Sequence, residues 1–212
     1  HDWVLAEITQ PEEWRAEPAV GQVPGLEELR SRDPSISRQE LEDRVSVSFW
    51  KWVEARSTGK PDKLSRFCMQ PPLDEASRRA LSLVNTPLRE VAVGSADLKR
   101  IDGKDGTDQA TLEVRWSGAQ DKGPPTHHRH LFILGRAEKT RSRRGLSSLD
   151  CPSCGGPLAS SDEVTCRYCN TPLTGGKHEW ALLAVSERPE DKPAPVRKAR
   201  RQEHDQSSPS DE

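Results

Sequence analysis

The chain has 212 residues, of which 32% are hydrophobic and 31% are charged, and its formal net charge at pH 7 is -2. Such a small net charge excludes a global field that would draw the protein onto nucleic acid or an anionic membrane, so any such contact must be local. No stretch approaches the roughly 18 consecutive apolar residues of a membrane-spanning helix, and the start lacks the layout of a signal peptide. The composition predicts one modest core with polar flanks. Because the first residue is His1 and not Met, we expect a fragment or processed product whose membrane anchor, if any, lies upstream of residue 1.

The amino-terminal half is expected to be mainly helical. Residues 1–10 alternate enough to predict a short strand, and the prolines and glycines of residues 10–33 predict a linker with at most a helical turn at residues 26–29. Ser37 and Glu40 form a capping-box pattern that predicts a helix over residues 38–55. We expect two further helices, near residues 62–69 and 73–84.

The hydrophobic period changes from 3.6 to two after residue 88. Val91 and Val93 open one predicted strand, residues 110–116 alternate as a half-buried second strand, and residues 128–137 form a third. Two Asp-Gly pairs between the first two strands are typical of hairpin turns. Helices followed by an antiparallel sheet predict an α+β fold.

Four of the five cysteines form two close pairs, which is the spacing of a metal site. They are Cys151, Cys154, Cys166 and Cys169. Two intervening residues let both sulfurs of a pair reach one ion, and the Gly or Asn after each pair suits a left-handed turn. Four thiolates leave zinc no open position, so we expect one structural Zn²⁺ per chain and not a catalytic one; iron would fit the same geometry but is the less usual occupant. The cysteine pattern also favours a reducing compartment.

Other residues admit two interpretations each. His127, His128 and His130 are either metal ligands or an exposed strand entrance, the latter being favoured. Cys68 is either a reactive thiol or, more simply, a buried small hydrophobic residue. Phe49, Trp50 and Trp52 either line a ligand pocket or, at helical spacing, belong mostly to the core.

Two basic clusters are candidate contacts for anionic lipid or for nucleic acid phosphates, with solvated surface as the alternative. The first comprises Lys139, Arg141, Arg143 and Arg144, next to the cysteines. The second lies in the tail, at residues 197–201, where neighbouring acids dilute it.

Residues 1–8 repeat part of the segment at residues 178–185. Both read His, an acid, Trp and then aliphatics, and a Pro-Glu pair follows each copy. The second copy directly follows the cysteine ribbon, so we expect a longer protein to carry another ribbon before His1.

These features together resemble the bacterial proteins that join a zinc ribbon to a domain of the Tim forty-four family, named for a subunit of the mitochondrial inner-membrane translocase. The resemblance rests on residues 2–5, 11–14, 49–55, 110–116, 151–158 and 166–169. It implies a cone-shaped α+β fold similar to nuclear transport factor two, followed by a zinc ribbon. It also implies chaperone tethering and contact with anionic lipid. The chain lacks the long basic amino-terminal region of the mitochondrial members, which argues against a role in presequence import.

The sequence therefore predicts four parts: a strand and linker at residues 1–33, a Tim forty-four-like domain at 34–146, the zinc ribbon at 147–187 and a disordered tail at 188–212. We expect a non-catalytic, membrane-associated adaptor or lipid-binding transport module, whose partner is a protein or an anionic membrane surface. It would lie in the cytoplasm or at the cytoplasmic face of a membrane. The alternatives are an enzyme of the same cone fold, such as an isomerase or dehydratase, and a protein that binds nucleic acid through the ribbon. The ribbon sequence lacks a basic face, which argues against the second alternative.

Overall fold

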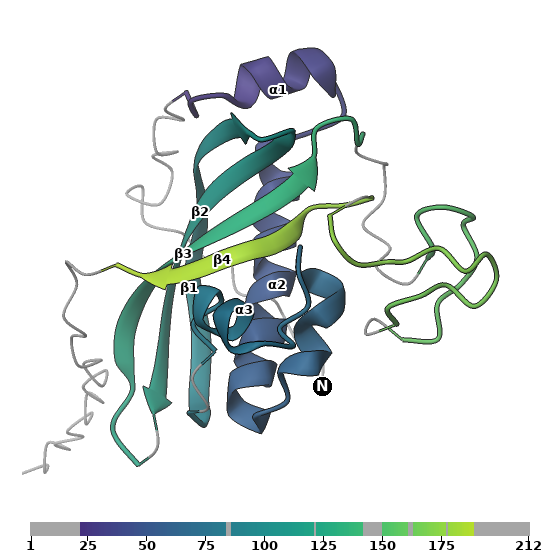
Figure 1. Ribbon diagram of the computed structural model, residues 1–212. Coiled ribbons are helices and arrows are strands. Elements are labelled where there is room, and N and C mark those ends of the chain that lie inside the picture. Colours follow the sequence, from purple (N-terminus) through teal and green to yellow (C-terminus); the bar gives the residue numbers. More distant parts are fainter. Residues whose placement is uncertain are drawn as a thin grey trace, which may run out of the picture.

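The computed structural model describes residues 22–83, 86–120, 122–141, 150–160, 163–176 and 178–188. The strand predicted at residues 1–10 and the tail predicted after residue 188 lie outside them. The described elements, in chain order, are α1 (Leu26–Arg32), α2 (Arg38–Thr58), the 3-10 helix η2 (Pro61–Phe67), α3 (Glu75–Ala80), β1 (Leu88–Lys104), β2 (Thr107–Gln120), β3 (Thr126–Ala137) and β4 (Ala181–Glu187). All four strands form one antiparallel sheet in the order β1-β2-β3-β4 (Figure 1). The predicted α+β class is confirmed.

The long helix α2 begins where the capping pattern predicts. Ser37 Oγ accepts a hydrogen bond from the backbone N–H of Glu40 at 3.0 Å, which satisfies one of the free N–H groups of the first turn. The helix ends at Gly59, whose φ of 66° is a left-handed conformation that glycine adopts without steric cost. It therefore continues three residues past the predicted end at Ala55.

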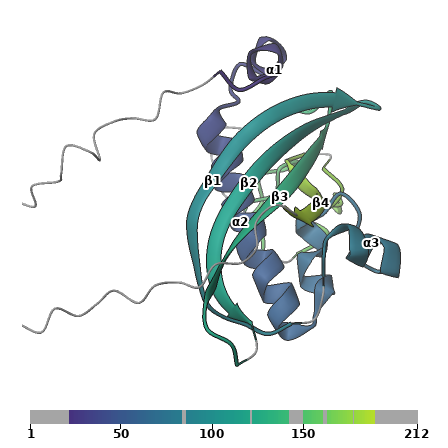
Figure 2. The same ribbon diagram turned by 90° about the vertical axis from the view of Figure 1, so that its left-hand side faces the viewer.

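The sheet curves around α2, which lies in its concave face (Figure 2). Asp105 and Gly106, with φ of 51° and 71°, form the tight turn between β1 and β2. The other Asp-Gly pair, at residues 102–103, lies inside β1 and not in a turn. Three irregularities of register along β1 add the local twist that lets a 17-residue strand bend.

Aromatic rings fill the space between α2 and the sheet. Phe49 and Trp52 of α2 contact Trp116 of β2 and Phe132 of β3, with ring centroids 5.6 to 6.1 Å apart. All four side chains are buried. The core interpretation of Phe49 and Trp52 is thus confirmed, whereas Trp50 is 48% exposed.

The other face of β2 is also covered at one point. Glu113 is buried on that face, where it accepts hydrogen bonds from Arg115 at 3.0 Å and Arg188 at 2.8 Å, and Lys99 Nζ lies 3.6 Å away. Burial alone raises the pKa of this carboxyl, but the three cations outweigh burial and leave the pKa below its usual value. The half-buried alternation predicted for residues 110–116 therefore understates how much of β2 is covered.

The linker predicted at residues 10–33, with at most a helical turn at residues 26–29, is more ordered in its described part than expected. Residues 26–32 form the two-turn helix α1, which buries Leu26 and Leu29. Gly25 precedes it with a φ of 79°, in a place where a Cβ would overlap the Ile101 carbonyl of β1. Pro24 also accepts a hydrogen bond from the Ile101 N–H at 2.9 Å, so this segment belongs to the body of the fold.

The helices predicted near residues 62–69 and 73–84 are shorter or tighter than expected. The first is the 3-10 helix η2, and the second is only the six-residue α3. Asp74 caps α3 by accepting a hydrogen bond from the Ser77 N–H at 2.7 Å. The helix therefore begins after Asp74, and Leu73, the predicted first residue, is exposed outside it.

The fourth strand changes the predicted division of the chain. The ribbon was expected to occupy residues 147–187, but β4 (Ala181–Glu187) pairs with β3 along the sheet. Leu182 and Val185 of β4 are buried in the main core. The cysteine loop is therefore an insertion between two neighbouring strands, and the body resumes after it.

A buried arginine joins the elements around this insertion. Arg136 of β3 is 1% exposed and donates to Asp33, after α1, at 2.7 Å. Its guanidinium also lies 3.5 Å from Asp108 of β2 and 4.7 Å from the centroid of the Trp180 ring, just before β4. One cation thus contacts groups from α1, β2 and the segment that enters β4.

We predict that Asp33→Ala destabilises the fold by about 3 kcal/mol, because it removes the nearest counter-ion of a buried charge. Urea unfolding followed by circular dichroism measures the change. The control is Glu27→Ala, which removes an exposed partner of Arg30 and is expected to change stability by less than about 0.5 kcal/mol. Equal effects of the two variants would contradict a structural role for Arg136.

Candidate metal centre

The four predicted cysteines come together in one cluster. Their Sγ atoms all lie within 4.8 Å of one another. Cys151 and Cys169 are 3.7 Å apart and Cys154 and Cys166 are 3.8 Å apart. Metal–sulfur bonds of about 2.3 Å in a tetrahedron place the sulfurs about 3.8 Å apart, so the spacing suits a four-coordinate ion.

Each cysteine pair sits on a tight turn of the same construction. The Gly155 N–H donates to the Cys151 carbonyl at 2.8 Å, and the Asn170 N–H donates to the Cys166 carbonyl at 2.8 Å. Gly155 and Asn170 have φ of 74° and 55°, as the predicted left-handed turns require. These turns aim backbone N–H groups at sulfur: those of Ser153 and Gly156 lie 3.4 Å from Cys151 and Cys154 respectively.

The two turns repeat a longer pattern that the sequence reasoning missed. Residues 151–158 and 166–173 both read Cys-x-x-Cys-x-x-Pro-Leu. Leu158 and Leu173 are buried together with Cys151 and Cys166 in a small separate core. Each Cys-x-x-Cys turn is called a knuckle below. The Pro-Leu pair that follows each knuckle was the sequence signal from which this small core could have been predicted.

The cysteine loop joins the body at a narrow neck. The Gly175 N–H donates to the Cys68 carbonyl, and the Ala137 N–H donates to the Gly176 carbonyl, both at 3.1 Å. Gly176 has a φ of 65°, and a Cβ there would overlap the Met69 side chain. Beyond this neck the loop projects sideways from the sheet (Figure 1). The end of β3 and the residues that follow η2 thus position the neck.

The arrangement can hold a metal but offers it no open position. All four ligands of a tetrahedral ion come from the protein, so no coordination site remains for water or substrate. Thr171 supports one ligand: its hydroxyl lies 3.2 Å from Cys169 Sγ and, with its backbone, lowers the pKa of that thiol, whereas the neighbouring thiols raise the pKa of Cys154. A thiol that ionises readily is a ready metal ligand.

The histidines of β3 do not form a second such cluster among the described residues. His128 and His130 share one face of the strand, but both are buried, so the predicted exposed entrance is wrong for them. The His128 ring stacks on Trp116 at 4.3 Å, and the His130 ring lies 5.2 Å from that of Trp52. His127 points to the other face and is exposed.

His130 is held neutral inside this aromatic core. The indole N–H of Trp116 donates to His130 Nδ1 at 3.1 Å, which places the ring proton on Nε2. Burial, and then the nearby Arg56 and His128, lower the pKa of His130 to about 4. The ring is therefore a packed, hydrogen-bonded core group.

Cys68 is a buried residue, as the simpler interpretation predicts. Its side chain is fully covered, and burial raises the pKa of the thiol to about 12. A thiol in this state is not nucleophilic at neutral pH.

The predicted basic cluster is described only in part. Lys139 and Arg141 follow β3 and are exposed, and Arg141 donates to the Glu138 and Thr140 carbonyls at 3.1 Å. Arg143, Arg144 and the basic tail lie outside the described residues.

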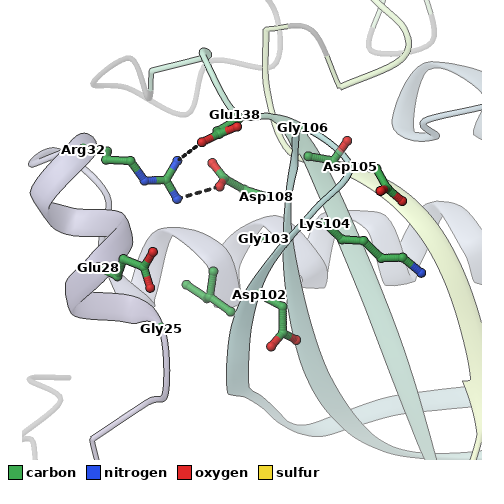
Figure 3. A pocket seen from close by; sticks show the side chains of 12 residues that line it. Gly25, Glu28, Arg32, Asp102, Gly103, Lys104, Asp105, Gly106, Asp108 and Glu138 are labelled. Atoms are coloured by element: carbon green, nitrogen blue, oxygen red, sulfur yellow. Dashed lines mark hydrogen bonds and ion pairs between the residues drawn. The ribbon is translucent and has the colours of Figure 1, made fainter.

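A polar pocket of about 400 Å³ lies between α1 and the β1–β2 turn, where no site was predicted (Figure 3). The Arg32 side chain lines the pocket and forms ion pairs with Asp108 at 2.8 Å and with Glu138 at 3.6 Å. Three further acids line it, namely Glu28, Asp102 and Asp105. Arg32 therefore already neutralises two of the acids of this pocket, Asp108 and Glu138.

We predict that the chain binds one metal ion and that Cys154→Ser loses it. Elemental analysis and the free-thiol count of protein prepared without added metal measure the occupancy. Removing the ion should disorder the loop but leave the far-ultraviolet circular dichroism of the sheet nearly unchanged, because the neck and β4 have hydrogen bonds of their own. Cys68→Ser is the control and should keep the metal. An occupancy near zero with the loop ordered would contradict the site.

We predict that acid destabilises the fold partly through His130. Its pKa is lower in the folded chain than in the unfolded chain. The contribution of neutral His130 to the free energy of unfolding is therefore complete above about pH 6.5 and is lost as the pH falls toward 4. The loss amounts to about 2 kcal/mol between pH 7 and pH 5. Urea unfolding of wild type and His130→Gln at both pH values measures it, and the metal site is common to both proteins. A variant as pH-sensitive as the wild type would contradict the prediction.

Scans against protein-family models, against curated proteins and against solved structures each find no match to this chain. A function for it therefore has to be argued from its own residues.

Proposed function

We propose that the chain is a non-catalytic adaptor, in which zinc stiffens the cysteine loop into a platform for a protein partner and basic residues beside the loop contact an anionic membrane. The observation that carries this proposal is the insertion of a closed four-cysteine site between β3 and β4, at the end of a narrow neck. A site with no open coordination position, presented away from the core, fits a scaffold better than a catalyst.

Zinc is the ion that we propose for the cluster. Four thiolates in a tetrahedron suit zinc or iron, and zinc is the usual occupant of paired Cys-x-x-Cys knuckles. Among the described residues of the loop, the buried aliphatic side chains are those of Leu158 and Leu173, so the metal would supply most of the folding free energy of this part.

The second knuckle offers the contact surface. Tyr168 is 62% exposed and Val164 is 44% exposed, although both are large hydrophobic residues. The Tyr168 ring lies against Gly156, where a Cβ would be only 2.9 Å from it, so the first knuckle supports the ring. An exposed tyrosine with one ring face against the protein is a common anchor of protein interfaces.

Membrane association is the second part of the proposal. No helix in the described residues is both long and apolar enough to cross a bilayer. Lys139 and Arg141 are exposed close to the start of the cysteine loop, and Arg143 and Arg144 follow in sequence. Each basic side chain at an anionic surface adds about 1 kcal/mol. The resemblance to the Tim forty-four family and its cone fold supports the same function.

Two alternatives fit the described residues less well. An enzyme of the cone fold needs a base beside a cavity, and His130, a buried group with a lowered pKa, has its Nδ1 lone pair occupied by Trp116. A nucleic-acid-binding ribbon needs a basic face, but Arg167 of the loop is paired with Glu163 at 3.3 Å.

We predict that the chain floats with vesicles that contain anionic lipid at low salt, and not with neutral vesicles. Flotation should fall steeply as salt is raised, because charge contacts are screened over a Debye length of about 8 Å at physiological ionic strength. Replacing Arg141, Arg143 and Arg144 by Gln should abolish most of it.

The matched control removes three exposed positive charges elsewhere, with Arg79, Arg100 and Lys122 replaced by Gln. This variant should float like the wild type. If both triple variants lose flotation equally, the contact is a general charge effect. If the wild type does not float even at low salt, the membrane part of the proposal fails and the protein partner remains.

A further inference from the structure

Three arginines stand in one row on the convex face of the sheet, which is turned away from α2 (Figure 2). Arg115 of β2 lies directly opposite Arg129 of β3, and the N–H of Arg188, just after β4, donates to the Arg129 carbonyl at 3.2 Å. The neighbouring Trp116 and His130 face α2, so the arginines alternate with them to the convex side. Like charges directly opposite one another on neighbouring strands destabilise the pairing. This arginine row therefore costs stability unless anions lie beside it.

A buried acid beside the arginine row neutralises it only in part. Glu113 accepts from Arg115 Nε at 3.0 Å and from Arg188 Nη1 at 2.8 Å, and Lys99 Nζ lies 3.6 Å away. Asp97 is opposite Glu113 on β1 and lies 3.9 Å from Lys99. Around Glu113 the described cations are Lys99, Arg115, Arg129 and Arg188, and the described acids on this face are Asp97 and Glu113. Positive charge is thus in excess here, although the whole chain is slightly negative.

The cations remain accessible while the acid that holds them is covered. The side chain of Arg115 is 50% exposed and that of Arg188 is 42% exposed, whereas Glu113 is 1% exposed. A guanidinium has five N–H donors in a planar fork, so each arginine keeps further donors after bonding to Glu113 through one nitrogen. Because the carboxylate already fixes the two guanidinium groups, an incoming anion would order less of their side-chain freedom.

The side chains around the arginine row indicate what kind of anion fits it. Leu131, directly opposite Glu113, and Ile133 are half-buried on the convex face of β3. They do not stand out from the sheet as side chains that insert into a bilayer do. Single-stranded nucleic acid is bound through exposed aromatic rings, and the exposed rings of the described residues, Trp50 and Tyr168, lie on α2 and the cysteine loop. Arginine beside aliphatic surface is typical of a protein interface.

We propose that the arginine row binds an acidic segment of a protein partner. Carboxylates of that segment would pair with the exposed edges of the guanidinium groups, and its apolar side chains would lie on Leu131 and Ile133. The row lies near the start of β3, whereas Lys139 and Arg141 follow the end of that strand. This surface is therefore an addition to the cysteine loop and the basic residues beside it.

The experiment titrates the full chain into a fluorescently labelled peptide, Glu-Glu-Leu-Glu-Glu-Leu-Glu-Glu, and follows its anisotropy. The first variant is Arg129→Gln, which leaves the three cations that contact Glu113 in place. The second variant adds Arg115→Gln. The matched control, Lys60→Gln with Arg79→Gln, removes two exposed positive charges outside the sheet. Thermal unfolding shows whether each variant keeps the fold, and the single variant serves alone if the double variant does not.

We expect Arg129→Gln to weaken peptide binding about 5-fold and the double variant about 30-fold, as one exposed ion pair per arginine implies. The control should stay within about 2-fold of the wild type, and raised salt should weaken binding. The proposal is overturned if the wild type does not bind the peptide at low salt, or if the control weakens binding as much as the double variant.

Anionic vesicles and double-stranded DNA are the comparison probes. Binding of either probe that depends on Arg129, without binding of the peptide, would assign the arginine row to that other partner and would also overturn the proposal. Tyr168→Ala in the cysteine loop should leave peptide binding unchanged, because the loop is not part of this surface.

Discussion

The buried ion pair between Arg136 and Asp33 is the contact on which the rest of the structure depends. A guanidinium that is 1% exposed is costly unless a counter-ion and further polar or aromatic groups surround it. Here those groups come from the end of α1, from β2 and from the residue that precedes β4. The charge thus favours one arrangement of segments that are far apart in the chain, which apolar packing alone would specify less sharply.

Among the described residues, the candidate metal centre meets this arrangement at its neck, Gly175 and Gly176. Its ligands, turns and two leucines all lie within residues 151–173, and the contacts that continue into the body are backbone hydrogen bonds at Gly175 and Gly176. The body supplies position, and an ion bound by the four cysteines would supply local order. This separation lets the residues of the second knuckle, 166–169, change to suit a partner without altering the packing of the sheet.

Local patterns in the sequence predicted the local features well. The Ser37 cap, the alternation in β2 and the cysteine spacing each depend on neighbours a few residues apart. The features that escaped depend on distant partners. From the sequence, Arg136 would be placed on the surface of a strand, because its counter-ion Asp33 lies 103 positions away in the chain. Only one turn of helix α1 was expected because Pro24, Gly25 and Pro34 around it suggest a linker, although Leu26 and Leu29 are buried against the body of the fold. β4 was assigned to the ribbon because nothing within it reveals that it pairs back across the insertion.

The insertion between β3 and β4 has a consequence for how the chain folds. These two strands are connected by roughly forty residues. Closing a loop of that length costs chain entropy, which opposes the pairing of the strands. An ion that gathers the two knuckles first shortens the free chain between the strands before they meet. The metal, although remote from the core, would then govern the rate at which the last strand arrives. Until it arrives, the edge of β3 stays open to strands from other molecules.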